Sequence, residues 1–454
     1  MTPTADASIP MLISPHRVLP LALPVLAENV LLMAVNWSDM ILAGRILQEP
    51  HYLAAITVAA YLVWFLKGIS DVVGVGVFAI AAREVGAGRT DEANRAAAQA
   101  VQMAFALGVA LAVVVYFTAN FISSLLAPQG LSVTLAADYL RHFCWAIPLD
   151  MVMLVGVSCL RAAGYTAAGM FVGLGVNIVN VALCWVLTVG AFGVPKFGWL
   201  GIALGASTAF ALGGVVVLFV LMRGVGVLRI PVRPTPPNFR MVVRILRVGV
   251  PAAAATIGLI LCHLAFVAVI ARLGEHASAA HGVAIQVESL SYLMGEAFAA
   301  ATGALVGQAL GAGRPDLAKA CGRAGMKWAA LFMGAMGVVF FTLSTQLCGL
   351  FSSKIEVSEL GGQVMKLMAL AEAPLGVLIV GIGVLRGSGD TGWLLFLNLT
   401  SMLLVRLPLA VLFTSSSFGW GLWGAWLAMF FDVNLRAIIA YARFRHGGWT
   451  KKRV

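Results

Sequence analysis

Residues 98–127 read AQAVQMAFALGVALAVVVYFTANFISSLLA and contain no Asp, Glu, Lys or Arg. A helix that crosses the apolar part of a bilayer needs about 20 such residues. The run is too long and too evenly apolar for the alternating strands of about ten residues that build an outer-membrane barrel. It therefore predicts a membrane-spanning helix.

The composition extends this prediction to the whole chain. Of the 454 residues, 61% are hydrophobic and 11% are charged, whereas soluble domains average about 25% charged residues. The mean hydropathy is +0.96. These values exclude an ordinary soluble enzyme, a disordered protein and a fibrous protein, and they predict an all-α polytopic membrane protein.

Similar apolar runs recur along the chain, and one long polar segment, 223–247, interrupts them with arginines and prolines. Such a segment breaks a helix and marks a linker. We predict an N-lobe over 1–222, a cytoplasmic linker over 223–242 and a C-lobe over 243–454, with six helices in each lobe. The twelve predicted helices cover 16–45, 52–81, 98–127, 138–160, 164–193, 199–222, 243–272, 279–310, 325–350, 362–385, 391–414 and 420–443.

The distribution of positive charge predicts the orientation of these helices. If the N-terminus lies in the cytoplasm, 22 of the 30 Lys and Arg residues fall in inner loops and tails. Cytoplasmic loops carry such an excess of Lys and Arg. We therefore predict a multi-pass protein of the inner (plasma) membrane with both termini in the cytoplasm, and we read the net charge of +11 as a topology signal and not as a nucleic-acid-binding surface.

The two halves resemble each other at an offset of 225 residues. The sequence Gly-Ala-Gly-Arg occurs at 86–89 and at 311–314, and Leu-Arg occurs at 160–161 and at 385–386. Because each half holds an even number of helices, the two repeats run parallel and are related by a pseudo-twofold axis along the membrane normal. Transporters commonly have this architecture.

These motifs together resemble the multidrug and toxic compound extrusion (MATE) family. The resemblance covers nearly the whole chain, and it rests on both Gly-Ala-Gly-Arg loops, on Leu-Arg-x-x-Gly at 160–164, on Leu-Arg-Gly-Ser-Gly-Asp-Thr at 385–391, on Pro-x-x-x-Pro at 20–24 and on Ser-Asp-Met-Ile-Leu-Ala-Gly at 38–44. It implies two six-helix lobes, a central cavity and secondary antiport of cationic or amphipathic small molecules, that is multidrug efflux, against H⁺ or possibly Na⁺.

Ionisable residues at bilayer depth are functional candidates by default, and Asp39 is the strongest here. It matches the family's helix-one aspartate, and a carboxyl group in an apolar pocket can bind and release a proton. The resemblance implies an N-lobe ion-coupling site of Asp39, Asn177 and Thr208. Asn180 lies three residues after Asn177 and so on the same helix face, and Pro24 is a plausible bend point of the first helix.

The resemblance also separates two branches of the family. The NorM-like branch carries acids in the C-lobe, at positions that are Leu259 and Leu375 here. Their absence favours the DinF-like branch, with coupling in the N-lobe, although Glu372, one turn before Leu375, could substitute. As further residues of a substrate cavity we predict Glu28, Asp150, Gln286, Glu288 and Glu296.

The sequence predicts neither an enzyme nor a cofactor site, and H⁺ or Na⁺ is expected only as the coupling ion. The cysteines and the single residues His263 and His281 have no metal-ligand spacing and no catalytic partner. We expect a monomer whose partners are lipophilic or cationic small molecules and membrane lipids, with no nucleic acid. The alternative is a flippase for lipid-linked oligosaccharide or peptidoglycan precursors, which needs cations in its cavity; Lys67 and Arg406 are the two that fall inside predicted spans.

Overall fold

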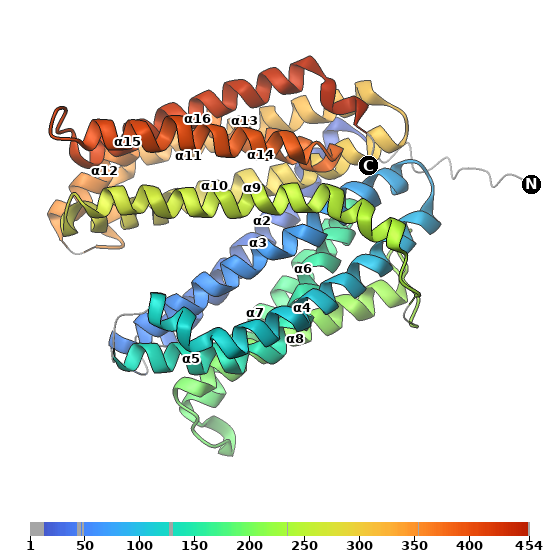
Figure 1. The fold of residues 1–454 in the computed structure, drawn as a ribbon, viewed down its shortest axis with the longest axis horizontal. Helices are drawn as coiled ribbons and strands as arrows, with labels where there is room; N and C mark the ends of the chain where they lie inside the picture. The colour runs from blue at the N-terminus through green and yellow to red at the C-terminus, as the bar shows by residue number, and fades with distance from the viewer. Residues whose placement is uncertain are drawn as a thin grey trace, which may run out of the picture. The chain divides into compact units, whose positions relative to one another are not determined.

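The computed structural model describes residues 13–42, 47, 50–126, 130–233, 235–352 and 354–452; in these residues the regular elements are helices joined by loops, and the one strand-like pairing is an isolated bridge between Val225 and Leu228 (Figure 1). The helices of the first half are η1 (Pro15–Arg17), α2 (Val18–Ile41), α3 (Pro50–Gly86), α4 (Thr90–Leu126), α5 (Leu131–Phe143), η3 (Cys144–Ala146), α6 (Ile147–Ala162), α7 (Thr166–Val189), η4 (Ala191–Gly193) and α8 (Trp199–Arg223). Those of the second half are α9 (Phe239–Ala271), α10 (Glu275–Gly311), α11 (Pro315–Gly349), α12 (Ile355–Ala369), α13 (Glu372–Ser388), α14 (Thr391–Ser401), η5 (Met402–Arg406), α15 (Leu407–Thr414), α16 (Gly421–His446) and η6 (Gly448–Lys451).

The lengths and hydropathies of these helices confirm the all-α polytopic membrane fold. Within the described residues, 11 helical segments are long and apolar enough to cross a membrane, and the bent pair α12–α13 brings the number to 12. The predicted N-lobe, linker and C-lobe boundaries stay predictions.

The predicted helices 138–160 and 391–414 each lie in one membrane-spanning segment that contains an irregular turn, whereas the predicted continuous helix 362–385 is wrong because that segment is broken. The 138–160 helix is divided by η3, the 362–385 helix is bent by 63° between α12 and α13, and the 391–414 helix contains the π-helical turn η5. A proline follows each interruption closely, at Pro148, Pro374 and Pro408. Proline lacks the N–H that the preceding turn needs, so it favours the start of a new helical segment over continuation of the old one.

The chain forms two compact units. Unit 1 contains 1–26, 86–88 and 250–454, and unit 2 contains 27–85 and 89–249. The helix α2 is continuous through Pro24 and passes from unit 1 to unit 2 between Leu26 and Ala27. In the same way α9 contains Pro251, and its chain passes from unit 2 to unit 1 between Gly249 and Val250.

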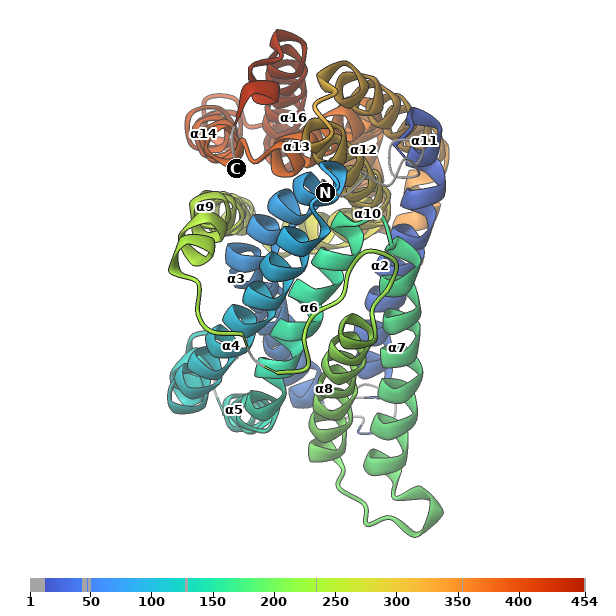
Figure 2. The ribbon, with the colours of Figure 1, turned by 90° about the vertical axis from the view of Figure 1, so that its right-hand side faces the viewer.

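Unit 2 depends on close helix contacts through glycine. The helices α7 and α8 lie side by side (Figure 2). A Cβ added at Gly205 of α8 would lie 2.6 Å from the backbone nitrogen of Cys184 in α7, and one at Gly201 would lie 2.6 Å from the backbone of Leu187. Only glycine at these positions lets the two backbones approach so closely.

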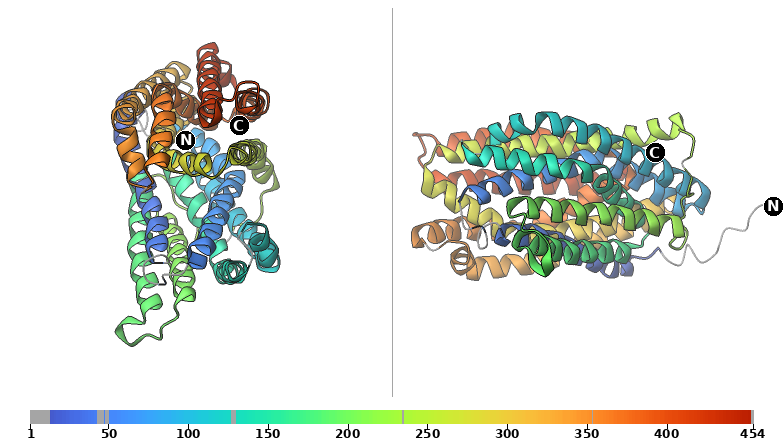
Figure 3. Two further views of the ribbon diagram at one scale, coloured as in Figure 1. Left: turned by 90° about the vertical axis from the view of Figure 1, so that its left-hand side faces the viewer. Right: turned by 90° about the horizontal axis from the view of Figure 1, so that it is seen from below.

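Unit 1 is built from long helices, of which α10, α11 and α13 pack against one another (Figure 3). Its largest core cluster includes the fully buried Trp426, whose indole N–H donates to Nδ1 of His281 at 3.2 Å. A second cluster joins the start of α2, at Val18 and Leu21, to residues of α10, α11, α13 and the C-terminal segment.

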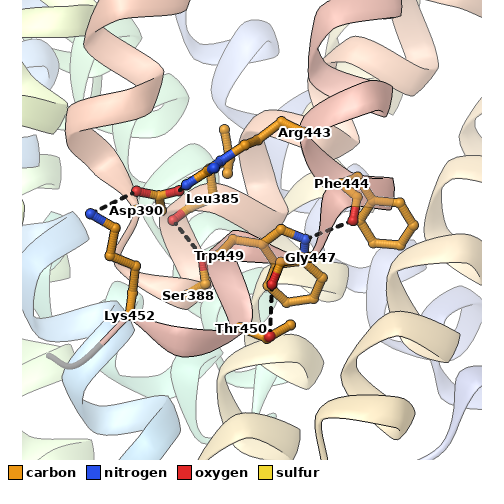
Figure 4. Close-up of polar contacts among 9 residues, drawn as sticks. All are labelled: Leu385, Ser388, Asp390, Arg443, Phe444, Gly447, Trp449, Thr450 and Lys452. Carbon is orange, nitrogen blue, oxygen red and sulfur yellow. Dashed lines mark hydrogen bonds and ion pairs between the residues drawn. The ribbon is translucent and has the colours of Figure 1, made fainter.

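The C-terminal segment folds back onto the end of α13 (Figure 4). The Asp390 carboxylate, which follows α13, binds Arg443 of α16 at 2.6 Å and Lys452 at 3.3 Å. Trp449 of η6 is fully buried, stacks on Phe444 and donates to the Phe444 carbonyl at 3.0 Å. Asp390, the sixth residue of the Leu-Arg-Gly-Ser-Gly-Asp-Thr motif, therefore binds the C-terminal segment on both sides of η6.

Candidate functional site

Asp39 lies in the last turn of α2, within unit 2, and its side chain is buried with only 6% of the residue exposed. Its Oδ1 atom has no hydrogen-bond partner among the described residues. The side chains of Asn180 and Cys184 lie within hydrogen-bonding reach of the carboxyl group, and Tyr139 lies near enough for an electrostatic interaction with it. The carboxyl group therefore lies among neutral polar groups and is not paired with a described cation.

One face of α7 runs along α2 and carries this polar environment. Asn177 Nδ2 donates to the Leu31 carbonyl of α2, and Ser38 of α2 donates to Asn180 Oδ1 at 3.3 Å. Asn180 Nδ2 in turn donates to Cys184 Sγ at 3.4 Å. Residues three or four apart share one face of a helix, so α7 presents its amides and thiol to α2 as a continuous seam.

The predicted set of Asp39, Asn177, Asn180 and Thr208 is assembled only in part. Asn180 accompanies Asp39, whereas Asn177 binds α2 two turns earlier along the helix. Thr208 of α8 donates to the Leu204 carbonyl of its own helix at 2.7 Å. No hydrogen bond joins Asn177 or Thr208 to Asp39 in the described part of the chain.

Glu28 forms an ion pair inside unit 2. Its Oε2 lies 2.7 Å from Nη2 of Arg161, in the last turn of α6, and only 4% of the residue is exposed. The arginine belongs to the Leu-Arg-x-x-Gly motif at 160–164. Glu28 was predicted as a cavity acid, and the structure gives it a cationic partner that the sequence did not identify.

Asp150 lies in the first turn of α6, just after η3, and is buried with 3% exposed. Within the described residues no hydrogen bond or ion pair is made by its carboxyl group. The surrounding side chains act on this group by shielding it from solvent. It is thus a second buried carboxyl group of unit 2 with no cation beside it. Its counterpart in the second repeat, 225 residues later, is the buried apolar Leu375.

A separate acidic pair lies in unit 1. Ser291 of α10 donates to Oε2 of Glu372, the first residue of α13, and Glu372 is fully buried. Glu288, on the same α10, is near enough to Glu372 for their charges to repel, and near enough to Arg406 for their charges to attract.

The other predicted residues of α10 have different environments. Glu296 is half-buried and lies 3.9 Å from Nη1 of Arg386, the repeat counterpart of Arg161. Gln286 is half-buried, and its backbone carbonyl accepts from Ser289 at 2.7 Å. The structure therefore distributes the predicted cavity residues between the two units, with Glu28 and Asp150 in unit 2 and the α10 residues in unit 1.

The strongest buried charge cluster of unit 1 surrounds Asp432 of α16. Its Oδ2 binds Arg406 of η5 and Arg436 of α16, each at 2.8 Å, and its Oδ1 accepts from Ser401 at 2.5 Å. All three charged groups are nearly or fully buried. The Arg406 guanidinium also lies over the Phe266 ring at 5.7 Å. Arg436 lies within the predicted helix 420–443 and was counted among the 22 charges on the cytoplasmic side, and the structure buries it in this cluster.

His263, His281 and the cysteines are packed among other side chains. His263 and His281 lie with ring centroids 6.3 Å apart, and His281 also contacts Phe266 and Trp426. All six cysteines are free and buried. Within the described residues no three His, Cys, Asp or Glu side chains are grouped as metal ligands would be.

Sequence reasoning missed Cys184 and Tyr139 as neighbours of Asp39. A buried cysteine is most often a small apolar packing residue, and that interpretation hid a hydrogen-bonding role. The signal that could have found it is the spacing of Asn177, Asn180 and Cys184, which places three polar groups on one face of an otherwise apolar helix.

Comparison with known sequences gives matches along nearly the whole chain. "Probable multidrug resistance protein NorM" of Thermotoga maritima is 26% identical over 438 residues, covering 96% of this chain and 93% of that protein. "Uncharacterized transporter YisQ" of Bacillus subtilis is 24% identical, covering 94% of both chains. "Multidrug resistance protein MdtK" of Klebsiella pneumoniae is 24% identical, covering 95% of both chains.

Comparison with solved structures gives the same fold. A MATE protein in the bent conformation superposes with a TM-score of 0.89 at 19% identity, covering 98% of both chains. A MOP superfamily transporter from Pyrococcus furiosus superposes with a TM-score of 0.90 at 19% identity, covering 99% of this chain and 100% of that one. The MatE family model matches twice, at residues 24–186 and 251–412, once in each predicted repeat. Because these matches cover more than half of the sequence, the chain belongs to the MatE family of multi-span membrane transporters.

Proposed function

We propose that this chain is a secondary antiporter that exports cationic or amphipathic small molecules in exchange for H⁺. The names of its NorM and MdtK relatives support multidrug extrusion. The finer assignment, coupling by protons through Asp39 in the N-terminal half as in the DinF-like branch, is our proposal.

The observation that carries this proposal is the burial of Asp39 with no cationic partner among the residues that the structure describes. A carboxyl group held among the neutral side chains of Asn180, Cys184 and Tyr139 is suited to exchange between protonated and ionised forms. A tightly held metal cation would demand several oxygen ligands, and the described residues around Asp39 offer one carboxylate, the Asn180 amide and the Tyr139 hydroxyl. The same donor set therefore favours H⁺ over Na⁺ as the coupling ion.

A transport assay tests the proposal. In everted membrane vesicles, a proton gradient and a Na⁺ gradient are imposed separately, and the movement of a fluorescent lipophilic cation is followed. The wild-type chain should respond to the proton gradient alone. Asp39→Asn keeps the size of the side chain but cannot titrate, so it should fold and lose proton-driven efflux. The control is Asp138→Asn, at a half-exposed carboxylate beside Arg141. Wild-type efflux by Asp39→Asn would contradict the proposal.

The proposed transporter lies in the inner membrane with both termini in the cytoplasm and works as a monomer in contact with membrane lipids. Reporter fusions placed in the 223–240 segment and after the C-terminus should both report a cytoplasmic position. A periplasmic signal at either site would contradict the predicted orientation.

The flippase alternative is less well supported by the charges of the molecule. A lipid-linked pyrophosphate needs cations that are not already neutralised, and Arg406 is bound to Asp432 at 2.8 Å. Export of a lipophilic cation under a proton gradient, with no translocation of a lipid-linked precursor in the same vesicles, would decide between the two functions.

A further inference from the structure

The ion pair between Glu28 and Arg161 lies at the beginning of the α2 segment that belongs to unit 2. Glu28 follows Pro24 by four residues, and unit 2 begins at Ala27. Proline has no N–H to donate to the carbonyl four residues before it, so the helix is least constrained by its own hydrogen bonds at this turn. Glu28 is therefore the first strongly bound residue of α2 after its weakest turn.

The helix α7 is shaped to receive this carboxylate. A Cβ added at Gly169 would lie 2.8 Å from Oε2 of Glu28, and one added at Gly173 would lie 3.3 Å from Cγ of Glu28. Both glycines lie on the face of α7 that carries Asn177 and Asn180. Glu28 thus lies against two glycines of α7 while its carboxylate pairs with Arg161 of α6. The contacts farther along α2 are single hydrogen bonds.

These contacts hold α2 unequally along its length. At Glu28 an ion pair with a buried carboxylate and a partly buried guanidinium must break before α2 can leave α6, and removal of one partner of a buried pair is strongly destabilising. At Ser38, next to Asp39, the contact is one hydrogen bond of 3.3 Å between neutral groups, and such a bond contributes only modestly to stability. The Asp39 end of α2 is therefore the end that a change of charge can displace.

We propose that Glu28, bound to Arg161 between Gly169 and Gly173, is a positioning residue for proton coupling: it anchors the Pro24 end of α2 so that protonation of Asp39 displaces the other end. This inference rests on the proposed coupling role of Asp39. In this scheme Glu28 holds α2 in place through its ion pair with Arg161 and takes no part in proton transfer. Neutralisation of Glu28 should release α2 from α6 and separate proton movement from substrate export.

Hydrogen exchange of backbone amides tests the anchor without reference to transport. The purified full-length wild type is compared with Glu28→Gln, which removes the charge, and with Gly169→Ala, which fills the space that Oε2 occupies. Both variants should increase the exchange rate of amides 27–35 about ten-fold, because the local opening energy falls. The matched control is Gly175→Ala on the same helix, where an added Cβ would meet nothing within 4 Å. It should exchange as the wild type does.

A rescue distinguishes the anchor from a general packing defect. Glu28→Asp shortens the side chain by one methylene, so it should offset the clash of Gly169→Ala and restore slow exchange in the double variant. If Glu28→Gln is not recovered as folded protein, Gly169→Ala and its rescue still decide. Wild-type exchange in Glu28→Gln or in Gly169→Ala, or failure of the rescue, would overturn the proposal.

A transport measurement then separates this proposal from the function on which it rests. In proteoliposomes, Glu28→Gln should lower the number of substrate molecules exported per proton taken up by about ten-fold, with the pH profile of proton uptake unchanged. Asp39→Asn should abolish proton uptake itself. Normal efflux by Asp39→Asn would refute proton coupling at Asp39 and leave the exchange result on Glu28 standing, whereas a wild-type export ratio in Glu28→Gln refutes the positioning role alone.

Discussion

Arg386 of α13 donates a hydrogen bond to Thr256 of α9 at 3.4 Å, and this contact repeats in neutral form the ion pair that Arg161 makes with Glu28. The two arginines are 225 residues apart, and Thr256 follows Pro251 by five residues as Glu28 follows Pro24 by four. In each repeat, the arginine in the last turn of α6 or α13 therefore reaches α2 or α9 just after the proline of that helix. Only the first repeat places a carboxylate there.

The Cys184 thiol should contribute to the environment of Asp39 through hydrogen bonds and not through its volume. Cys184→Ala removes the acceptor of Asn180 and the donor to the Ile202 carbonyl, so it should shift the pH dependence of efflux. Cys184→Ser keeps both roles and should preserve most activity. The control is Cys159→Ala, another fully buried cysteine of unit 2. Equal pH profiles for the two alanine variants would show that the thiol only fills space.

The close packing of α7 against α8 should make Gly205 sensitive to the smallest side chain. In Gly205→Ala the new methyl group would lie 2.6 Å from the Cys184 backbone, and overpacking of this kind costs about 1–3 kcal/mol. The midpoint of thermal unfolding in detergent should fall clearly below that of the wild type. Gly175→Ala, with open space around it, should not change the midpoint, and equal midpoints for the two variants would contradict the observed contact.

Asp432 should be among the most important polar residues for the stability of unit 1. Asp432→Asn leaves Arg406 and Arg436 buried without a counter-charge, which costs about 3–5 kcal/mol. Arg436→Met should cost less, because it leaves the pair of Arg406 and Asp432, at 2.8 Å, intact. Thermal unfolding of the purified variants measures the difference. The reverse order would mean that Asp432 does not hold the two guanidinium groups together.

Glu372 should be less important for coupling than Asp39. Glu372→Gln keeps an oxygen that can accept from Ser291, so the variant should fold and retain partial proton-driven efflux. The control is Glu356→Gln, at an exposed carboxylate of α12. Complete loss of efflux by Glu372→Gln at normal expression would move the coupling site into unit 1 and refute the branch assignment.

The sequence predicts the membrane fold because the signal is local and strong. An uncharged run such as 98–127 has no stable place outside a bilayer or a core, and α4 covers nearly all of it. The duplicated motifs give the repeat, and the family model matches both halves. The resemblance to the family grouped Asp39 with Asn177, and helical spacing added Asn180, whose side chain lies beside Asp39; the coupling role of this set stays a prediction.

What the sequence could not predict depends on contacts between helices distant in the chain. The spacing of apolar residues does not say how two helices rotate against each other, so the partner of Glu28 could not be distinguished from several other cations. Arg436 lies ten residues before the end of α16 and looked like a cytoplasmic charge until the structure placed Asp432 beside it. The breaks before α6 and α13 were missed because Pro148 and Pro374 lie in runs whose hydropathy alone favours continuous helices.

The second core cluster of unit 1 has a consequence for how the protein is made. It joins Ile13 and Val18 to Trp449, residues separated by more than 400 positions along the chain. Ribosomes deliver a chain from its N-terminus, so the first residues of this cluster enter the membrane long before their last partner has been synthesised. Until α10 and α11 have been made, the apolar start of α2 must be covered by lipid, by the insertion machinery or by a chaperone, and the cluster is complete only when Trp449 joins it.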